Sequence, residues 1–297
     1  MIAVLGSINM DLVLSVPCFP QPGETVAGTD VATYSGGKGA NQAVAAARLG
    51  SEVQFFGKVG DDVFGDRLLA ELRNNHINVS AIEREPDCAS GMASIWVNDQ
   101  GENAIVLAAG ANKCVDENYV QRHLDAINGA DILLFQLEIP IETVASVLRQ
   151  LPKEGPIVVL DPAPAQDLSS ISLDRIDYLT PNEHELRSIT GKDSVEEGAF
   201  LLIDQGAKNV ICTLGGQGAI WLSNDGMIAH FSSPEVAVID STGAGDAFNG
   251  ALAWALQAHS IEEAIGQGIL GGALATTKRG AQDSLPYLRE IEALERI

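Results

Sequence analysis

The chain has 297 residues, of which 46% are hydrophobic and 20% charged, and its formal net charge is −22 at pH 7. This composition suits a globular protein with a large core, and the negative charge argues against nucleic acid or an anionic membrane as partner. The four cysteines are far apart and form no Cys-x-x-Cys pair, which favours free thiols over a disulfide framework or zinc site. No hydrophobic run approaches the ~18 residues of a membrane span, so we expect a cytoplasmic protein.

The first predicted strand, residues 2–5, runs into Gly-Ser-Ile-Asn-Met-Asp. Asn9 offers a donor and an acceptor, and Asp11 accepts from two hydroxyls, which suits a polyhydroxylated ligand. A polar turn without a ligand is the alternative. Residues 12–34 form short alternating pieces broken by prolines, which predicts a small exposed β-structure.

A glycine loop, Ser-Gly-Gly-Lys-Gly-Ala-Asn-Gln at residues 35–42, leads into an alanine-rich helix that stops at Leu49-Gly50. It is not a Walker A loop, because Lys38 is followed by glycine rather than Ser or Thr. Close backbone approach at Gly37, the cation of Lys38 and the amide of Asn41 fit a sugar or its developing phosphate. A glycine-rich helix start with a solvated lysine is the alternative.

Residues 53–59 are predicted to form a strand, and Asp61-Asp62 to cap a helix that reaches about residue 76. Alternating strands at 92–97 and 103–107 flank a turn. With residues 12–34 they predict one small sheet made from two insertions, 12–34 and 90–109, within a single domain of residues 1–297. Such a sheet commonly acts as a lid, and its edges favour pairing with a second copy. Dimerisation through it is a hypothesis.

From about residue 115 helices and strands alternate: helix 116–127, strand 132–135, helix 141–151 and strand 157–160. This alternation predicts an α/β fold, a mostly parallel sheet with helices on both faces. Ligands of such sheets gather at the carboxyl ends of the strands, where Glu138 follows one strand. Asn182 and Glu185 lie one turn apart at a helix start, and both could reach a hydrated Mg²⁺. Capping of that helix is the alternative for Asn182.

Residues 210–214 are predicted to form a strand that ends in Thr-Leu-Gly-Gly-Gln-Gly, without the spacing of a dinucleotide-binding motif. Residues 236–239 read as a buried strand, followed by Asp240, a glycine-rich turn and a helix over about 243–257. This geometry aims backbone N–H groups and the helix N-terminus at one point, where an anion fits. The role that suits Asp246 there is a base for a hydroxyl that attacks phosphate, with helix capping as the alternative. A further helix is expected over 261–277.

Six of these segments, in order and across nearly the whole chain, resemble the ribokinase branch of the phosphofructokinase-B family of sugar kinases. The segments are Gly-Ser-Ile-Asn-Met-Asp, Gly-Gly-Lys-Gly-Ala-Asn-Gln-Ala, Pro-Asn-Glu-His-Glu, Thr-Leu-Gly-Gly-Gln-Gly, Asp-Ser-Thr-Gly-Ala-Gly-Asp and Lys-Arg-Gly-Ala-Gln. The resemblance implies a Rossmann-like α/β fold with a small β lid, a homodimer formed through the lid, and transfer of the ATP γ-phosphoryl group to O5 of D-ribose.

The resemblance also implies site residues, with ATP, Mg²⁺ and an activating K⁺ as cofactors. Asp246 would be the base, and the backbone N–H groups of Gly243, Ala244 and Gly245 the anion hole. The sugar would be held by Asn9, Asp11, Gly37, Lys38, Asn41 and Glu138. The nucleotide site would be lined by Asn182, Thr213, Gly215, Gly218 and Gly245, with Glu185 acting on Mg²⁺ through water. K⁺ would lie at Asp240, Thr242, Ala275, Lys278, Gly280 and Ser284, partly on backbone carbonyls.

Two departures from the family pattern stand out: Ser241 where threonine is more frequent, and Ile269 where some members have a histidine beside adenine. Three other functions compete. A kinase of the same family acting on fructose or 2-deoxyribose would share the phosphate chemistry. A non-catalytic sugar-sensing protein would have no use for Asp246. A nicotinamide oxidoreductase is disfavoured by the missing dinucleotide spacing.

Overall fold

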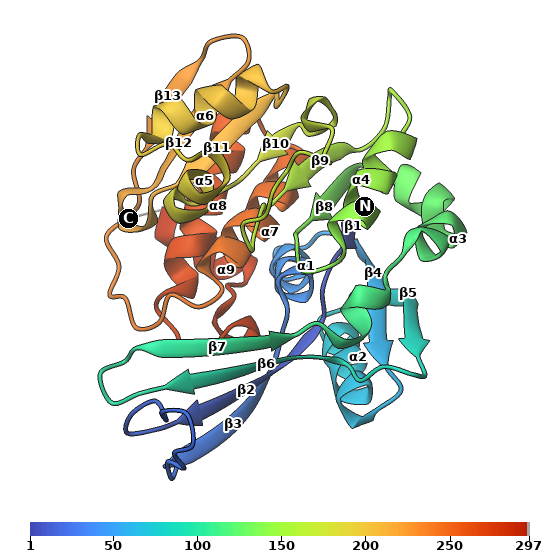
Figure 1. Ribbon diagram of the computed structural model, residues 1–297. Helices are drawn as coiled ribbons and strands as arrows, with labels where there is room; N and C mark the ends of the chain where they lie inside the picture. Colours follow the sequence, from blue (N-terminus) through green and yellow to red (C-terminus); the bar gives the residue numbers. More distant parts are fainter. Residues whose placement is uncertain (296–297) are drawn as a thin grey trace.

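A nine-stranded sheet forms the centre of the computed structural model, which describes residues 1–295 (Figure 1). Its strand order is β13-β12-β11-β10-β9-β8-β1-β4-β5. Neighbouring strands from β11 to β5 run parallel, whereas β12 and β13 are antiparallel to their neighbours. The strands are β1 (Ile2–Leu5), β4 (Val53–Gly60), β5 (Asn78–Glu85), β8 (Ile132–Phe135), β9 (Ile157–Leu160), β10 (Tyr178–Leu179), β11 (Asn209–Thr213), β12 (Ala219–Ser223) and β13 (Ile228–Phe231).

Helices cover both faces of this sheet. One face packs against α3 (Glu117–Asn128), α4 (Ile141–Gln150), α5 (Glu183–Thr190) and α6 (Val195–Asp204). The other packs against α1 (Lys38–Arg48), α2 (Val63–Asn74), α7 (Ala244–Leu256) and α8 (Ile261–Ala275), with α9 (Leu288–Glu295) beside α8. Because β1 and β8 are enclosed on both sides, every residue in them is buried, which explains their uninterrupted apolar sequences. The α/β fold predicted from the sequence is confirmed.

A second, four-stranded sheet, called the small sheet below, lies to one side of the large one (Figure 1). It consists of β2 (Asn9–Ser15), β3 (Asp30–Gly36), β6 (Gly91–Val97) and β7 (Asn103–Ala108), in the order β3-β2-β6-β7. The two stretches of alternating residues thus combine as predicted, with β2 and β6 parallel. Since β2 begins at Asn9, Asn9 and Asp11 lie on a strand of the small sheet and not in the polar turn considered above.

The prediction of a strand at residues 236–239 is wrong. This segment is irregular, and 67% of Val238 and 58% of Ile239 remain exposed. The β-branched run finds no partner strand, because the backbone N–H groups of Ile239 and Asp240 both donate to the carbonyl of Thr276 beyond α8. Strand β5, by contrast, escaped the sequence analysis, since its sequence NVSAIERE is mostly polar. None of the helices in residues 1–295 is long and apolar enough to cross a membrane.

Candidate active site

Asp246 lies in the first turn of α7, directly after the glycine-rich turn. Gly243 occupies the N-cap position with φ of 76°, a left-handed conformation that glycine adopts without strain. The carboxylate does not bond its own helix terminus. Instead Oδ2 accepts from Nδ2 of Asn41 at 2.8 Å and Oδ1 from Nε2 of Gln42 at 3.2 Å, both on α1. These hydrogen bonds link α1 and α7, each of which follows a glycine-rich loop, through the carboxylate of Asp246, which is only 6% exposed.

A chain of buried polar groups extends from Asp246 toward the sheet. Nε2 of Gln42 also donates to Oδ2 of Asp161 at 2.8 Å, and Oε1 of Gln42 accepts from Nε2 of Gln136 at 2.6 Å. Burial raises the pKa of Asp161 well above its usual range and also raises that of Asp246, although Lys38, Asn41 and Gln42 partly oppose the second shift. Gln42, Gln136 and Asp161 were not predicted as site residues. Their positions after glycine-rich or strand-end segments were the available signal.

Glu138 is the acceptor that joins the first strand to the first glycine loop. Its Oε2 accepts from the Ser7 hydroxyl at 2.5 Å, from Nδ2 of Asn9 at 3.3 Å and from the backbone N–H of Lys38 at 3.1 Å. Oδ1 of Asn9 in turn accepts from Nδ2 of Asn112 at 2.7 Å. Asn9, Lys38 and Glu138, which the sequence placed at one site, are therefore brought together, with Asn112 as a residue that sequence reasoning missed.

Asp11 lies close to the backbone of Gly36, where a Cβ would come within 2.1 Å of the Asp11 carboxylate. Any larger residue at position 36 would therefore have to displace the Asp11 carboxylate. Burial, reinforced by the nearby charges of Glu138 and Asp246, raises the pKa of Asp11 to about 7. Oδ1 of Asn41 is buried and has no hydrogen-bond partner among residues 1–295. An unpaired buried acceptor of this kind fits a hydroxyl donor of a bound sugar.

Lys38 supplies positive charge to this acidic region. Burial on its own lowers the pKa of Lys38, but Asp246, Asp161, Glu138 and Glu185 outweigh it, and the pKa is raised. In the described part of the chain, no carboxylate oxygen lies within 4.0 Å of its Nζ. The ammonium group is therefore charged and has no close ion-pair partner among the described residues, which would suit a cation that binds phosphate.

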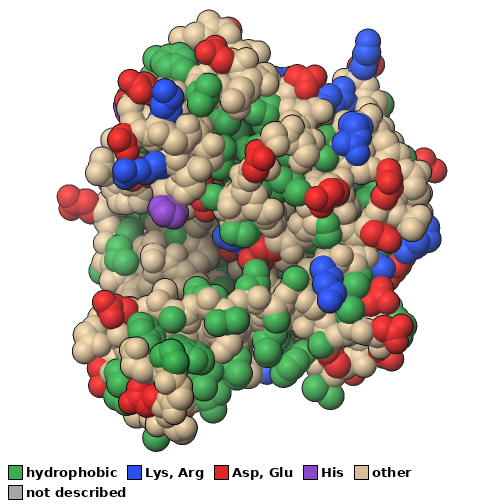
Figure 2. All heavy atoms as spheres, in the orientation of Figure 1, with side chains coloured by type: hydrophobic (Ala, Val, Ile, Leu, Met, Phe, Trp, Pro, Cys, Tyr) green, Lys and Arg blue, Asp and Glu red, His purple; other side chains and the backbone are tan. Residues whose placement is uncertain are grey.

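Two adjoining cavities lie around the N-terminus of α7. The larger, of about 600 Å³, contains Thr213, Gly215, Gly218 and Gly245 of the predicted nucleotide site. Its apolar walls include Ile269, which the resemblance places beside adenine, and Val236, Val238 and Phe248, which were not assigned to the nucleotide beforehand. The smaller, of about 180 Å³, contains Lys38, Asn182, Glu185, Asp246 and residues 243–245, and it shares Thr213, Ser241, Ala244 and Gly245 with the larger. Figure 2 shows the surface hollowed between the small sheet and the rest of the molecule, with charged side chains inside.

The helix N-terminus at Asn182 forms a capping box. Oδ1 of Asn182 accepts from the backbone N–H of Glu185 at 2.8 Å, and Oε2 of Glu185 accepts from the backbone N–H of Asn182 at 2.9 Å. Capping, the alternative for Asn182, is thus observed, while both residues still line the smaller cavity. His184, in contrast, lies on the surface.

The proposed cation segment is held together by Asp240. Its Oδ1 accepts from the N–H and hydroxyl of Thr242, at 2.9 and 2.7 Å, and its Oδ2 from the N–H of Gly280 at 3.0 Å. Burial alone raises the pKa of Asp240, but these donors outweigh it and lower the pKa. Nζ of Lys278 points to Glu290, at 2.6 Å, and the hydroxyl of Ser284 donates to the carbonyl of Ala281 at 2.8 Å. If Lys278 binds a cation, its ligand atom would therefore be the backbone carbonyl oxygen.

A buried carboxylate at a helix N-terminus, near a cluster of polar side chains and beside a large cavity, is an arrangement suited to phosphoryl transfer. The profile of the pfkB family carbohydrate kinases matches residues 1–288. The chain belongs to this family of carbohydrate kinases. The family resemblance found in the sequence is thereby confirmed.

Ribokinases and a deoxyribokinase are similar to this chain over nearly its full length. A ribokinase of Haemophilus influenzae is 42% identical over 301 residues, covering 99% of this chain and 98% of its own. A deoxyribokinase of Salmonella typhi is 36% identical over 296 residues, with 97% and 96% covered. Among solved structures, the ribokinase of Thermotoga maritima superposes with a TM-score of 0.92 at 36% identity, covering 100% of this chain and 99% of its own. The Arabidopsis thaliana ribokinase complexed with ribose and ATP gives 0.93 at 30% identity, with 100% and 98% covered.

Proposed function

We propose that this kinase transfers the γ-phosphoryl group of ATP to the O5 hydroxyl of D-ribose. The observation that carries the proposal is the position of Asp246, which is buried in the lining of the smaller cavity, next to the large cavity that contains Gly215 and Gly218, and is near enough to Glu138 for that charge to raise its pKa. The similar proteins that are named ribokinases support ribose as the substrate, and the Arabidopsis structure contains ribose together with ATP.

In this mechanism Asp246 accepts the proton of the attacking hydroxyl. Asn41 and Gln42 fix the orientation of its carboxylate through their two hydrogen bonds. Asn9, Asp11, Gly37, Lys38, Asn41 and Glu138 hold the sugar. Backbone N–H groups of Gly243, Ala244 and Gly245 stabilise charge on the transferred group. In this structure the N–H of Ala244 donates to the carbonyl of Ser241 at 3.2 Å.

The adenine nucleotide would occupy the larger cavity, with Thr213, Gly215, Gly218 and Gly245 along it and Asn182 in the adjoining cavity. Ile269 would provide an apolar contact where some family members have a histidine. Mg²⁺, which would neutralise phosphate charge, would be reached by Glu185 through water, because Mg²⁺ usually keeps several of its waters. Oε2 of Glu185 is engaged in the capping box, which leaves Oε1 for this contact.

The position of the transferred phosphate tests the proposed reaction. Incubation with ATP, Mg²⁺ and ribose should give one product whose phosphorus signal couples to the C5 protons in nuclear magnetic resonance. The analogue 5-deoxyribose, which lacks the attacking hydroxyl, should give no phosphorylated sugar. A product phosphorylated at C1, or phosphorylation of 5-deoxyribose, would contradict O5 as the nucleophile.

2-Deoxyribose is the second candidate substrate, because a deoxyribokinase is 36% identical over almost the full length. The phosphate chemistry would be unchanged. Only the contacts to the sugar hydroxyls, in the region of Asn9 and Asp11, would differ.

The KM for ribose should depend on pH through Asp11. With a pKa of about 7, the Asp11 carboxyl is mostly protonated at pH 6 and mostly ionised at pH 8. Since the ionised form accepts from sugar hydroxyls, the KM should fall about tenfold between these pH values. Steady-state kinetics at both pH values test this dependence. In the variant Asp11→Asn the KM should be higher and nearly independent of pH, and a wild-type KM that is constant from pH 6 to 8 would refute the assignment.

We also propose a K⁺ site formed by Asp240, Thr242, Ala275, Lys278, Gly280 and Ser284. The hydrogen bonds of Asp240 to Thr242 and Gly280, which bring two of these segments together, support it. Replacing Na⁺ by K⁺ at constant ionic strength should raise kcat, because the cation would order the turn that precedes Gly243. An unchanged rate across a full K⁺ titration would count against the site.

The small sheet is proposed to cover the sugar and to pair with a second copy. Large hydrophobic residues on its edge strands β3 and β7 are exposed: 60% of Val31, 58% of Ile105 and 65% of Val106. Figure 2 shows hydrophobic side chains gathered over this sheet. Val106→Lys should shift the protein from dimer to monomer in sedimentation velocity, while Val63→Lys, at an exposed position on α2, should not. A wild-type protein that is monomeric at high concentration would contradict the dimer.

A further inference from the structure

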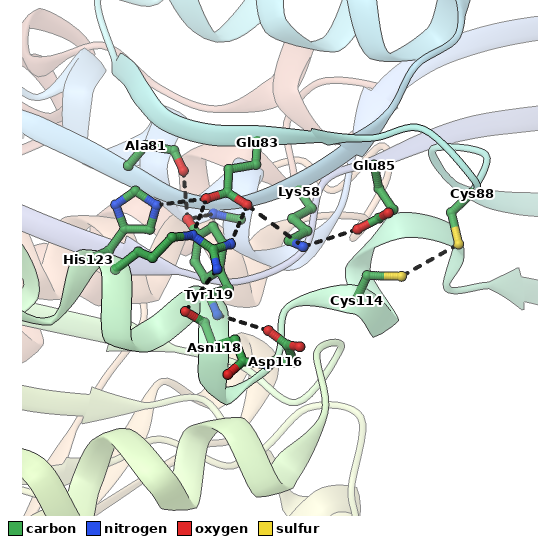
Figure 3. Close-up of polar contacts among 12 residues, drawn as sticks. Lys58, Ala81, Glu83, Glu85, Cys88, Cys114, Asp116, Asn118, Tyr119 and His123 are labelled. Carbon is green, nitrogen blue, oxygen red and sulfur yellow. Dashed lines mark hydrogen bonds and ion pairs between the residues drawn. The ribbon is translucent and has the colours of Figure 1, made fainter.

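Two of the four cysteines lie side by side. Sγ of Cys88 and Sγ of Cys114 are 3.5 Å apart, and both side chains are partly exposed (Figure 3). Cys18 is exposed and Cys212 is buried, and neither has another cysteine beside it in the described residues. The spacing of 26 residues between Cys88 and Cys114 gave no hint of this proximity in the sequence.

The pair lies at the base of the β6–β7 hairpin of the small sheet. Cys88 belongs to the turn between β5 and β6, and Cys114 is the last residue of the 3₁₀ helix η1 (Gly110–Cys114), which follows β7. The two segments already touch, because the N–H of Ala111 donates to the carbonyl of Ala89 at 2.8 Å. Gly110 has φ of 52°, and a Cβ there would come within 2.5 Å of the same carbonyl. A bond between the sulfurs therefore needs no large backbone movement.

Only a short approach separates the thiols from a covalent bond, whose S–S length is about 2.0 Å. Both thiols are accessible to a small oxidant, and Lys58 lies in the same cluster, 3.1 Å from Oε2 of Glu85 (Figure 3). Burial, together with the adjacent Cys88 sulfur, raises the pKa of the Cys114 thiol. The Cys114 thiol therefore stays protonated near neutral pH.

We propose that Cys88 and Cys114 form a reversible regulatory disulfide when the enzyme is exposed to hydrogen peroxide. The Cys88 thiolate attacks one oxygen of hydrogen peroxide, the O–O bond breaks, and the departing hydroxide takes up a proton to leave as water. Sγ of Cys114 then attacks the resulting sulfenic acid, the S–O bond breaks, and a second water leaves with the Cys114 proton. In sum, two thiols are oxidised to one disulfide and one hydrogen peroxide is reduced to two waters.

The disulfide would affect the proposed sugar site through η1, which contains Asn112. Asn112 lies two residues before Cys114, and its side chain accepts from the N–H of Ile8 at 3.0 Å and donates to Oδ1 of Asn9 at 2.7 Å. Even the small shift of η1 that brings Cys114 to Cys88 would lengthen the hydrogen bond from Asn112 to Asn9. This consequence, unlike the disulfide itself, rests on the proposed function. Oxidation should therefore raise the KM for ribose roughly threefold to tenfold, as expected for one weakened hydrogen bond, with a smaller effect on kcat.

The test uses the full chain carrying Cys18→Ser, which prevents cross-linking between molecules through the exposed thiol. After hydrogen peroxide treatment, peptide mapping by mass spectrometry should find Cys88 linked to Cys114, with Cys212 still a free thiol. The disulfide closes a loop across the hairpin, so the oxidised protein should also melt a few degrees higher. Dithiothreitol should reverse the link, the melting shift and the rise in KM.

The additional variant Cys88→Ser provides the matched control, since it should keep the basal activity and lose all three responses to peroxide. Free Cys88 and Cys114 thiols after oxidation would overturn the proposal. A Cys88–Cys114 disulfide with an unchanged ribose KM would overturn the coupling to the sugar site. The mapping does not depend on catalysis, so absence of turnover with ribose would refute the proposed function separately from the disulfide.

Discussion

Asp246→Asn is expected to lower kcat by at least about 100-fold, the lower end of the usual contribution of a general base. The replacement keeps the shape of the side chain but cannot accept the hydroxyl proton. Oδ1 of the new asparagine can still accept from Asn41 or Gln42, which donate to the carboxylate in the native protein. Sugar binding, measured by calorimetry in the absence of ATP, should weaken far less than turnover.

The matched control is Asp204→Asn, a substitution of an exposed carboxylate at the end of α6, which should leave kcat unchanged. Turnover of Asp246→Asn near that of the wild type would refute the assignment of the base. An equal loss of sugar affinity and of kcat would show instead that Asp246 acts mainly in binding.

Lys38→Met should have the second large effect, a loss of about 100-fold or more in kcat at pH 7. The ammonium group faces four carboxylates, and its positive charge opposes the rise that burial causes in the pKa of Asp246. Without it the pKa of Asp246 rises further, so a smaller fraction of the base is ionised at neutral pH. The transferred phosphoryl group also loses a cation.

The two losses separate in a pH profile of kcat. Because a higher pKa means that Asp246 ionises only at higher pH, the rising limb for Lys38→Met should move to higher pH, with partial recovery of rate there. Loss of the phosphate contact alone would lower kcat without moving that limb. Lys153→Met, at an exposed position after α4, should change neither kcat nor its pH profile. A Lys38→Met enzyme with the wild-type rate and profile would contradict both roles.

Buried strands and loop-preceded helices were predictable because each carries a local signal. The strands at 2–5, 132–135 and 157–160 are short apolar runs enclosed by helices on both faces, and the structure has them at those bounds. A short apolar run gave a wrong strand prediction at residues 236–239. A β-branched run forms a strand only where a sheet edge is available, and here the backbone is bound to Thr276 instead.

The side chains that join separate parts of the site could not be predicted in the same way. Gln42 contacts both Asp161 and Asp246, across 119 and 204 residues of sequence, and no local pattern specifies such a contact. Asn112, which binds Ile8 and Asn9 from 104 and 103 residues away, was missed for the same reason. Positions 38, 41 and 246, in or directly after the two glycine-rich loops, were found because loop chemistry is local, whereas their mutual distances depend on the packing of α1 against α7.

The central claim, that the chain is an ATP-dependent ribose kinase, is tested most directly by ADP release from ATP and Mg²⁺ in the presence of K⁺. The purified protein would be compared with D-ribose, 2-deoxyribose, D-fructose and no sugar, after a melting curve has established that it is folded and binds ATP. We predict rapid ADP release with ribose, slower release with the other two sugars, and almost none without sugar. A folded, ATP-binding protein that releases no ADP with ribose would contradict the account.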